Sequence, residues 1–420
     1  MTSSEIPTGI PSKKIRILFL AWGYSIHAQR RIQLFADDPL FEVAVVSTYD
    51  YRLSPAITIP LSNAGKTRKA PDTSGGTGHF SPYKNLKKVA YPFTLASKFI
   101  GEIITSFRDF RILKNAVDTI QPDVIFLQTL LYPNYLVYLL KRRAPVIITF
   151  WNGDVTWWAK WTGIERLLKK NIIIHGVKIA SAITVNSTTA FNACIGYGKP
   201  AKDIHLIPYP GIDCSIFRPI DTKSAREYIS CNASRIVFWP RGIGDYLNFD
   251  TLVSASRDIL KTYPDLHFIV LHPNRELDAS ITEGLTRDGI GKNFTFLQRI
   301  PFEDMPYYYS ASDMMISISS NDSLPNTMLE AMACGCPVIM GDIPQIRDWV
   351  TDGKNGYLCP VRDPGLLAQC IRKIIENHEH MNEKFIKENL ELIAGKVDSR
   401  KMSIMIKNLV MDVSSRSKEI

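Results

Sequence analysis

The stretch from Asn321 to Val338, NDSLPNTMLEAMACGCPV, constrains the fold of this chain more than any other segment. The apolar run 314–318 before it predicts a buried parallel strand, and Pro325 favours the first turn of a helix that continues to Ala333. The turn 334–337 then leads into another apolar run. A loop that leaves a strand and opens a helix lies at the edge where open parallel sheets bind ligands and where free backbone N–H groups meet phosphate oxygens.

Two carboxylates flank this helix start. Asp322 lies in the loop, and Glu330 lies eight positions later, inside the helix. Carboxylates at these two depths can grip two parts of one elongated ligand, such as the ribose and the sugar of a nucleotide sugar, while helix amides hold its pyrophosphate. A capping Asp and a solvated helical Glu would give the same spacing. The flanking strand, proline and turn favour the ligand site.

Length and composition predict two ordinary globular domains. The chain has 420 residues, of which 45% are hydrophobic and 22% charged. Residues 1–14 lack the apolar core of a signal peptide, and no run of 18 apolar residues predicts a membrane span. The seven scattered cysteines favour a reducing cytoplasm, and the isolated pair Cys334 and Cys336 lacks the partners of a zinc site.

Positive charge is concentrated in the first half. Up to Cys214 there are 26 Lys and Arg against 14 Asp and Glu, whereas the remainder has 24 against 27. The basic half predicts an anionic partner, either a membrane surface, a phosphorylated acceptor or a nucleic acid. No DNA- or RNA-binding signature accompanies the charge, so we expect no nucleic acid partner. Solubility alone would also account for the imbalance.

The order of predicted elements indicates doubly wound parallel sheets. A strand at 15–20, a glycine loop at Trp22-Gly23, a helix at 27–35 and a strand at 41–47 open the first of them. Residues from about 52 to 88 are rich in Ser, Gly, Pro and Lys and predict a mobile loop. The tail after Asn377 is expected to be helical. Further strands are expected at 124–127, 146–149, 182–185, 205–207, 235–239, 267–271, 294–297, 314–318 and 337–340.

Several motifs resemble those of retaining glycosyltransferases of family 4. They are the acidic-x7-Glu pair, the segment 207–219 beginning IPYPGID, and Trp151-Asn152-Gly153-Asp154-Val155, which is similar to a WGSDV motif. The resemblance covers most of the chain and implies the α/β fold called GT-B, in which two Rossmann-like doubly wound parallel-sheet domains face a cleft and a C-terminal helical tail crosses back. The implied boundaries are 1–213 for the acceptor-side domain, 214–390 for the nucleotide-sugar-binding domain and 391–420 for the tail.

The resemblance also implies a reaction. A sugar moves from a nucleotide-diphosphate sugar with retention, without a metal or another cofactor. Arg241 would bind the pyrophosphate, Glu330 the ribose and Asp322 the transferred sugar, and the leaving phosphate would take the acceptor proton. Further donor contacts are expected from Leu324, Pro325, Asn326 and Thr327, and acceptor-side contacts from Gly23, His27, Trp151 and Asp154.

The sequence departs from the family pattern at three places. A lysine usual five or six residues after Arg241 is replaced by Tyr246 and Leu247. Asp322 stands where Glu is usual, and Trp151 stands where many members carry His. These departures leave the donor and the turnover open, without affecting the expected fold.

We therefore expect a hexosyltransferase that acts on a glycan or lipid-linked acceptor in cell-surface polysaccharide or glycolipid synthesis, in the cytoplasm and peripheral to the membrane. Tryptophans beside basic residues suit a membrane interface or a sugar-stacking groove, although a packed surface helix would equally explain them. A GT-B nucleotide-sugar epimerase and a nucleotide-sugar-binding protein without turnover stay as alternatives. The residues concerned are Trp157, Trp158, Lys160, Trp161, Arg166, Lys169 and Lys170.

Overall fold

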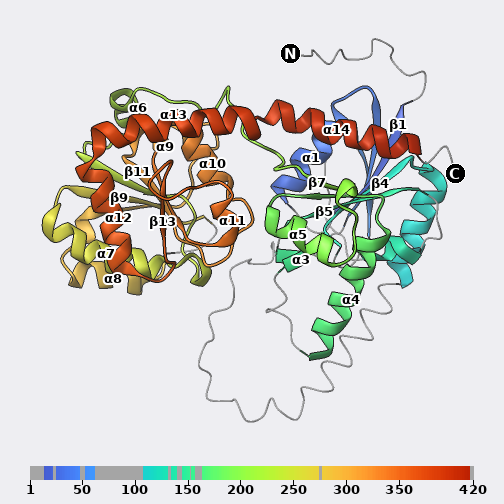
Figure 1. Cartoon of the computed structure of the whole chain (residues 1–420), viewed down its shortest axis with the longest axis horizontal. Coiled ribbons are helices and arrows are strands. Elements are labelled where there is room, and N and C mark those ends of the chain that lie inside the picture. The colour runs from blue at the N-terminus through green and yellow to red at the C-terminus, as the bar shows by residue number, and fades with distance from the viewer. Residues whose placement is uncertain are drawn as a thin grey trace.

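The computed structural model contains two parallel sheets that form two lobes, with two long helices running along both (Figure 1). In open sheets of this kind, the helices that connect the strands cover both faces. The structure describes residues 14–21, 25–47, 53–61, 107–130, 134–139, 144–151, 153–156, 163–273 and 277–416.

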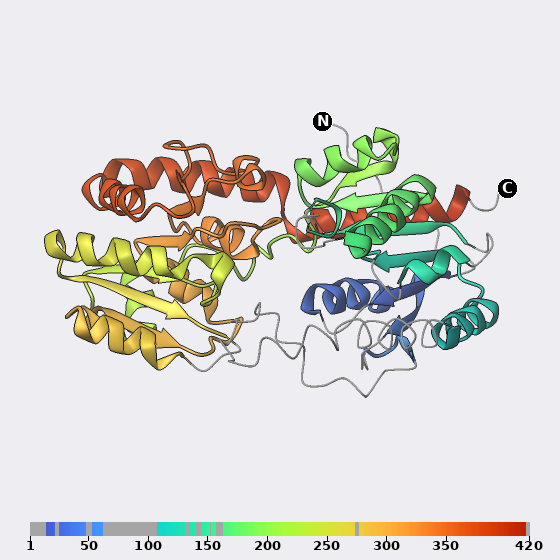
Figure 2. The same ribbon diagram turned by 90° about the horizontal axis from the view of Figure 1, so that it is seen from below.

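The N-terminal domain is built on seven parallel strands in the order β3-β2-β1-β4-β5-β6-β7. Successive residues of β1 enter opposite cores, with Leu18 on one face and Phe19 on the other, and helices lie on both sides of the sheet (Figure 2). The strands are β1 Ile15–Ala21, β2 Phe41–Ser47, β3 Ile57–Pro60, β4 Val124–Gln128, β5 Val146–Phe150, β6 Ala182–Val185 and β7 Ile204–Leu206. The helices are α1 Ile26–Ala36, residues 107–120, η1 Asn134–Leu139, α3 Gly153–Thr156, α4 Gly163–Ile179, α5 Thr188–Gly196 and η3 Ala201–Asp203.

The C-terminal domain repeats this plan with six parallel strands in the order β10-β9-β8-β11-β12-β13. Val237 and Phe238 of β8 enter the cores on its two faces. The strands are β8 Arg235–Trp239, β9 Leu266–Leu271, β10 Phe294–Leu297, β11 Met314–Ser317, β12 Val338–Gly341 and β13 Tyr357–Cys359. The helices are α6 Thr222–Tyr228, η4 Asp245–Leu247, α7 Phe249–Thr262, α8 Ala279–Arg287, η5 Gly291–Asn293, α9 Met305–Ala311, α10 Asn326–Ala333, α11 Pro344–Arg347 and α12 Pro364–Glu376.

The tail crosses from the second domain back to the first, as expected. Helix α13 (His378–Lys396) packs against α10, and α14 (Ser399–Arg416) contributes Met402 and Ile406 to the core that holds Phe19. Two backbone hydrogen bonds fix the junction, because Ile212 donates to the Val397 carbonyl at 2.8 Å and Ser399 donates to the Ile212 carbonyl at 2.9 Å. The expected fold class is confirmed.

The predicted strands agree with the structure to within one or two residues, and the structure adds two strands that were not predicted, β13 and, in the expected loop, β3. Residues 57–60 form β3, which pairs in parallel with β2 and places Thr58 opposite Val45. The β-branched run Ile57-Thr58-Ile59 favours a strand, but the Ser- and Pro-rich residues around it hid the signal. Residues 62–88 of that loop lie outside the described part of the chain.

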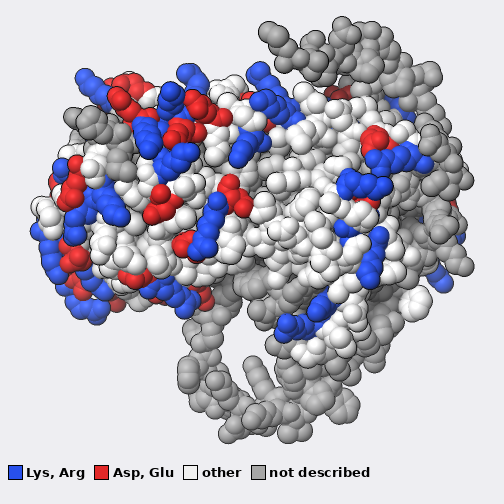
Figure 3. Space-filling model, in the orientation of Figure 1, with Lys and Arg blue, Asp and Glu red and all other residues white. Residues whose placement is uncertain are grey.

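Helix α4 projects away from the N-terminal domain (Figure 1). Leu167 and Leu168 near its start are 60% and 47% exposed, and Arg166 and Lys170 beside them are exposed as well. On the face shown in Figure 3, basic side chains gather over its outer end, whereas both signs of charge are interspersed over the C-terminal domain. Within the described ranges, no helix has the length and apolar content needed to cross a bilayer.

The tail junction requires a glycine at position 211. Gly211 has φ +74°, and a Cβ there would clash with the Val397 carbonyl oxygen and lie 2.9 Å from Met402 Cγ. We expect Gly211→Ala to lower the free energy of unfolding by about 3 kcal/mol, because backbone strain and a steric clash add. Urea unfolding followed by circular dichroism measures the loss.

Gly289→Ala is the matched control, because Gly289 has φ +72° and its added Cβ would meet open space. Its expected loss is about 1 kcal/mol, from backbone strain alone. Equal losses in the two variants would contradict the steric account of the junction.

Candidate functional site

Each sheet reverses its direction of connection at one point, and Arg241 and Asp322 lie at the reversal in the C-terminal sheet. In the C-terminal sheet, β8 and β11 are neighbours, and the chain proceeds from them toward opposite edges. Arg241 follows β8 and Asp322 follows β11. Crevices at the carboxyl ends of strands form at such switch points in open parallel sheets. The topology therefore brings together two residues that are 81 positions apart in the sequence.

Arg241 and Asp322 form an ion pair. Arg241 Nη2 lies 2.6 Å from Asp322 Oδ2, and the two side chains are 17% and 12% exposed. Asp322 also accepts hydrogen bonds from Ser319 Oγ at 3.2 Å and from the Ser323 amide at 2.9 Å. The pair is largely enclosed but still reachable, so a ligand with oxygen atoms can compete for both partners.

Asn248 holds together the two loops that carry this pair. It adopts the left-handed backbone conformation with φ 57°, and its Nδ2 donates to the Ile318 carbonyl at 2.6 Å and to Ser320 Oγ at 2.9 Å. The Ser320 amide in turn donates to the Tyr246 carbonyl at 2.7 Å. These bonds fix the loop after β11 against the loop after β8, so the spacing of Arg241 and Asp322 does not depend on their ion pair alone.

The start of α10 offers unpaired hydrogen-bonding groups. Pro325 is its N-cap, and no side chain caps the helix, so the first amides, at Asn326 and Thr327, face outward from its N-terminus. The hydroxyls of Ser323 and Thr327 are buried and find no hydrogen-bond partner among the described residues. Leu324, also predicted as a donor contact, packs against the core below. This arrangement fits phosphate oxygens, which accept from both amides and hydroxyls.

Glu330 lies deeper along α10 than Asp322. Its side chain is 8% exposed, and Tyr309 Oη donates to Glu330 Oε2 at 2.9 Å. Burial raises the pKa of Glu330 to about 6, and the Tyr309 hydrogen bond and the charges of Arg30 and Arg241 oppose that rise. The sequence did not single out Tyr309, because three tyrosines follow one another there and only the helix face selects the last.

Three of the four predicted acceptor-side residues lie together in the N-terminal domain. The rings of His27 and Trp151 are 5.6 Å apart, and Asp154 accepts from the Trp151 amide at 2.9 Å and from Thr129 Oγ1 at 2.7 Å. Burial raises the pKa of Asp154 to about 6. His27 lies on α1, Thr129 and Trp151 directly follow β4 and β5, and Asp154 lies in the first turn of α3. Gly23 lies outside the described residues.

The two domains contact each other through polar and aromatic side chains. The Arg30 guanidinium on α1 lies 4.5 Å from the centre of the Phe302 ring. Thr188 Oγ1 at the start of α5 donates to the Asp348 carboxylate after α11 at 2.6 Å. Residues of both domains thus meet near the ends of α1 and α5, and the acceptor-side residues belong to the same side of the first domain.

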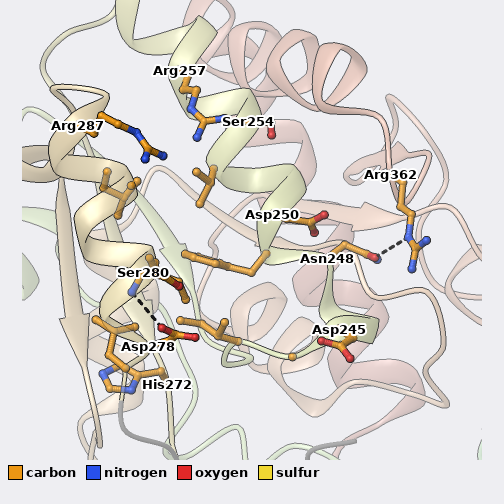
Figure 4. A pocket seen from close by; sticks show the side chains of 18 of the residues that line it. Asp245, Asn248, Asp250, Ser254, Arg257, His272, Asp278, Ser280, Arg287 and Arg362 are labelled. Carbon is orange, nitrogen blue, oxygen red and sulfur yellow. Dashed lines mark hydrogen bonds between the residues drawn. The ribbon is translucent and has the colours of Figure 1, made fainter. Parts of the chain in front are cut away.

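A separate groove lies between α7 and α8 (Figure 4). It has a volume of about 880 Å³ and an apolar floor that includes Phe249 and Leu285. Arg257 on its rim pairs with Asp288 at 2.6 Å, and Arg362 donates to Asn248 at 3.1 Å. The groove contains none of the three predicted catalytic residues, so we place the candidate site at the β8–β11 switch point instead.

Two family models match the chain. Residues 71–216 match Glycosyltransferase Family 4, and residues 234–377 match Glycosyl transferases group 1. The resemblance noted in the sequence is thereby confirmed, with one model for each domain.

Known proteins with similar sequences include a glycosyltransferase and a synthase by name. A D-inositol 3-phosphate glycosyltransferase of Geodermatophilus obscurus is 29% identical over 195 residues, which is 44% of this chain and 42% of that protein. N-acetyl-alpha-D-glucosaminyl L-malate synthase of Bacillus anthracis is 25% identical, with 58% and 62% of the two chains covered. The chain thus spans less than half the length of the inositol-phosphate relative.

Solved structures of the same fold cover nearly the whole chain. Sucrose-phosphate synthase from Thermosynechococcus elongatus matches with a TM-score of 0.72 and 16% identity over 96% of this chain and 100% of that one. Anabaena HepE in complex with UDP-glucose matches with a TM-score of 0.68 and 16% identity, covering 95% and 100%. At these identities the likeness shows the fold alone, and that fold is GT-B.

The burial of Glu330 should make stability depend on pH. Its pKa of about 6 in the folded chain lies above the ordinary value of 4.5, so the folded state binds the proton more tightly. Stability is therefore lost as the pH rises from about 4.5 to 6, by roughly 2 kcal/mol. We expect Glu330→Gln to be more stable than the parent chain by about that amount at pH 7.5 and equally stable at pH 4.5.

Urea unfolding at the two pH values measures this difference. Glu283→Gln, on an exposed position of α8, serves as the control and should change stability little at either pH. A Glu330→Gln variant that is less stable than the parent at pH 7.5 would contradict the conclusion that burial destabilises the ionised Glu330 carboxylate.

Proposed function

We propose that this chain, whose two halves match glycosyltransferase family models, is a retaining glycosyltransferase that uses a nucleotide-diphosphate sugar. One observation carries the proposal: a cation, two carboxylates and an open helix N-terminus meet at the β8–β11 switch point. An elongated ligand with a diphosphate in its middle and hydroxyl groups at both ends complements this set.

The donor would lie with its diphosphate at the start of α10. Arg241 would turn from Asp322 to the phosphate oxygens, joined by the amides near Asn326 and Thr327. Glu330 would accept hydrogen bonds from the ribose hydroxyls, and Asp322, released from Arg241, would accept them from the sugar. Asn248 holds the two loops together independently of the ion pair, so the loops can keep their positions when the Arg241 side chain turns.

The reaction breaks the bond between the anomeric carbon and the phosphate oxygen and forms a bond from that carbon to an acceptor oxygen. The leaving diphosphate takes the acceptor proton, so no protein base is assigned. Arg241 and the α10 amides stabilise the charge that develops on the leaving group, which is a preorganised electrostatic role. His27, Trp151 and Asp154 line the acceptor side, where domain closure would exclude water. We propose that this step needs no metal ion. Activity that is unchanged in the presence of EDTA would support this.

The acceptor would be a glycan or a lipid-linked compound, in the synthesis of a cell-surface polysaccharide or glycolipid. Charge supports an anionic acceptor, because the first half of the chain carries the excess of Lys and Arg. The names of two relatives include inositol 3-phosphate and L-malate, both anionic. We place the enzyme in the cytoplasm, where its seven free cysteines suit a reducing environment.

We further propose that α4 contacts an anionic membrane surface. Exposed Leu167 and Leu168 stand beside Arg166, Lys169 and Lys170 on a helix that projects from the domain. Apolar and basic side chains together suit an interfacial helix. The tryptophans at 157, 158 and 161, and Lys160, lie outside the described residues.

Calorimetric titration with UDP, GDP, ADP and CMP tests the donor site. We expect selective binding of one nucleoside diphosphate and a loss of at least about tenfold in affinity in Glu330→Ala, because ribose hydroxyls would lose a charged acceptor. Glu283→Ala should bind like the parent chain. Absence of binding to any nucleotide would sink the proposal.

Product analysis then separates the enzyme classes. Incubation with the matching nucleotide sugar and a candidate acceptor should give an α-linked product and free nucleoside diphosphate. An epimerised nucleotide sugar would instead establish an epimerase, and tight binding without any product or hydrolysis would establish a binding protein without turnover.

Co-sedimentation with vesicles tests the membrane contact. We expect binding to phosphatidylglycerol vesicles, loss of most of it in a Leu167→Ser, Leu168→Ser variant, and weakening by salt. A Lys261→Gln, Lys354→Gln variant removes two exposed cations from the C-terminal domain and should bind unchanged. Equal retention of all three proteins, or of none, would contradict a role for α4.

A further inference from the structure

Arg30 is the basic residue through which α1 reaches the other domain. Figure 1 shows α1 on the side of the N-terminal domain nearest the C-terminal domain. The half-buried Arg30 side chain ends 4.5 Å from the ring centre of Phe302, in the segment between β10 and α9. Tyr209 Oη donates to the Arg30 carbonyl at 3.1 Å. The backbone is therefore held by a contact that does not involve the side chain.

Packed aromatic rings connect this contact to the candidate donor site. Phe302 lies edge-on against Phe217, with 5.2 Å between ring centres, and Phe217 lies 6.4 Å from the ring of Tyr309. Tyr309 holds the Glu330 carboxylate through its hydroxyl. Two aromatic rings, those of Phe302 and Phe217, thus lie between Arg30 and Tyr309.

The positive charge of Arg30 acts on Glu330 directly. Burial raises the pKa of Glu330, and among the charges that oppose this rise Arg30 acts more strongly than Arg241 does. Arg30 belongs to α1 of the N-terminal domain, whereas Arg241 follows β8 of the C-terminal domain. The field at the donor site therefore comes from both domains.

The Arg30 guanidinium is available to a ligand. Within the described ranges it pairs with no carboxylate, whereas Arg241 pairs with Asp322. The adjacent Arg31 is fully buried, stacks on Tyr209 and donates to Thr149, so it cannot serve in its place. An aromatic ring against the face of a guanidinium leaves the N–H groups at its edge free, and their fork matches two oxygens of a phosphate.

We infer that Arg30 is a donor-binding residue that α1 contributes to the diphosphate of the nucleotide from across the domain boundary. The inference rests on the proposed function. It adds a second cation to the site, because the charge of Arg241 is partly neutralised by its ion pair with Asp322. Because Arg30 and Arg241 belong to different domains, a diphosphate between them holds the two domains together. The β-phosphate, which becomes more negative when the sugar leaves, strengthens this hold on the product.

Calorimetric titration of Arg30→Gln with the nucleoside diphosphate that the parent chain binds, and with its monophosphate, tests the role. We expect diphosphate affinity to fall about tenfold, equivalent to about 1.4 kcal/mol, and monophosphate affinity to fall at least threefold less. Arg30→Lys should recover part of the diphosphate affinity, because it keeps the charge but loses the planar fork. Arg257→Gln, whose cation pairs with Asp288 beside the separate groove, should bind like the parent.

Three results would overturn the inference. Unchanged diphosphate affinity in Arg30→Gln would show that the cation does not reach the donor, and an equal loss for both nucleotides would show that it does not read the β-phosphate. A raised KM for the acceptor with an unchanged KM for the nucleotide sugar would assign Arg30 to the acceptor. Absence of nucleotide binding by the parent chain would instead defeat the proposed function itself, so the two failures are distinguishable.

Discussion

The parallel pairing of every strand is the constraint on which the site depends. Because all strands of a sheet run the same way, each connection must return over one face, and every carboxyl end leaves at the same edge. Where the direction of connection reverses, between β8 and β11, the loops diverge and leave room for a ligand. Arg241 and Asp322 stand on the two sides of that division, so their ion pair is a consequence of strand order.

The site keeps polar groups in states that cost stability. Desolvation opposes the ionisation of Glu330 and raises its pKa. The buried hydroxyls of Ser323 and Thr327 have no hydrogen-bond partner among the described residues. An unsatisfied buried group costs about 1–3 kcal/mol. The apolar cores on both faces of the sheet offset this cost, and a ligand rich in oxygens would relieve it. The groups that cost stability are the same groups that the proposed nucleotide sugar would contact.

The two domains are joined in three different ways, and each has its own consequence. Helix α14 buries Ile406 in the core of the first domain, which makes the tail a structural part of both. Thr188 and Asp348 form exchangeable hydrogen bonds at the boundary. Arg30 and Phe302 form a cation–π contact, and the charge of Arg30 lowers the pKa of Glu330 in the candidate site. The first connection is buried in an apolar core, whereas the Thr188–Asp348 hydrogen bonds are exposed to solvent.

The sequence by itself determined the fold class and the loop and helix that carry the acidic pair, because strands, helix starts and turns are encoded by neighbouring residues. The segment 321–338 predicted a strand, a loop, a helix and two carboxylates, and the structure contains all of them. Local pattern also misled at 57–60, where loop-like neighbours hid β3. Only the tertiary structure decided that Asp322 pairs with Arg241, that Tyr309 rather than a neighbouring tyrosine holds Glu330, and that Arg30 reaches Phe302. These contacts join residues from separate elements, and their distances depend on how sheets and domains pack, which no local pattern records.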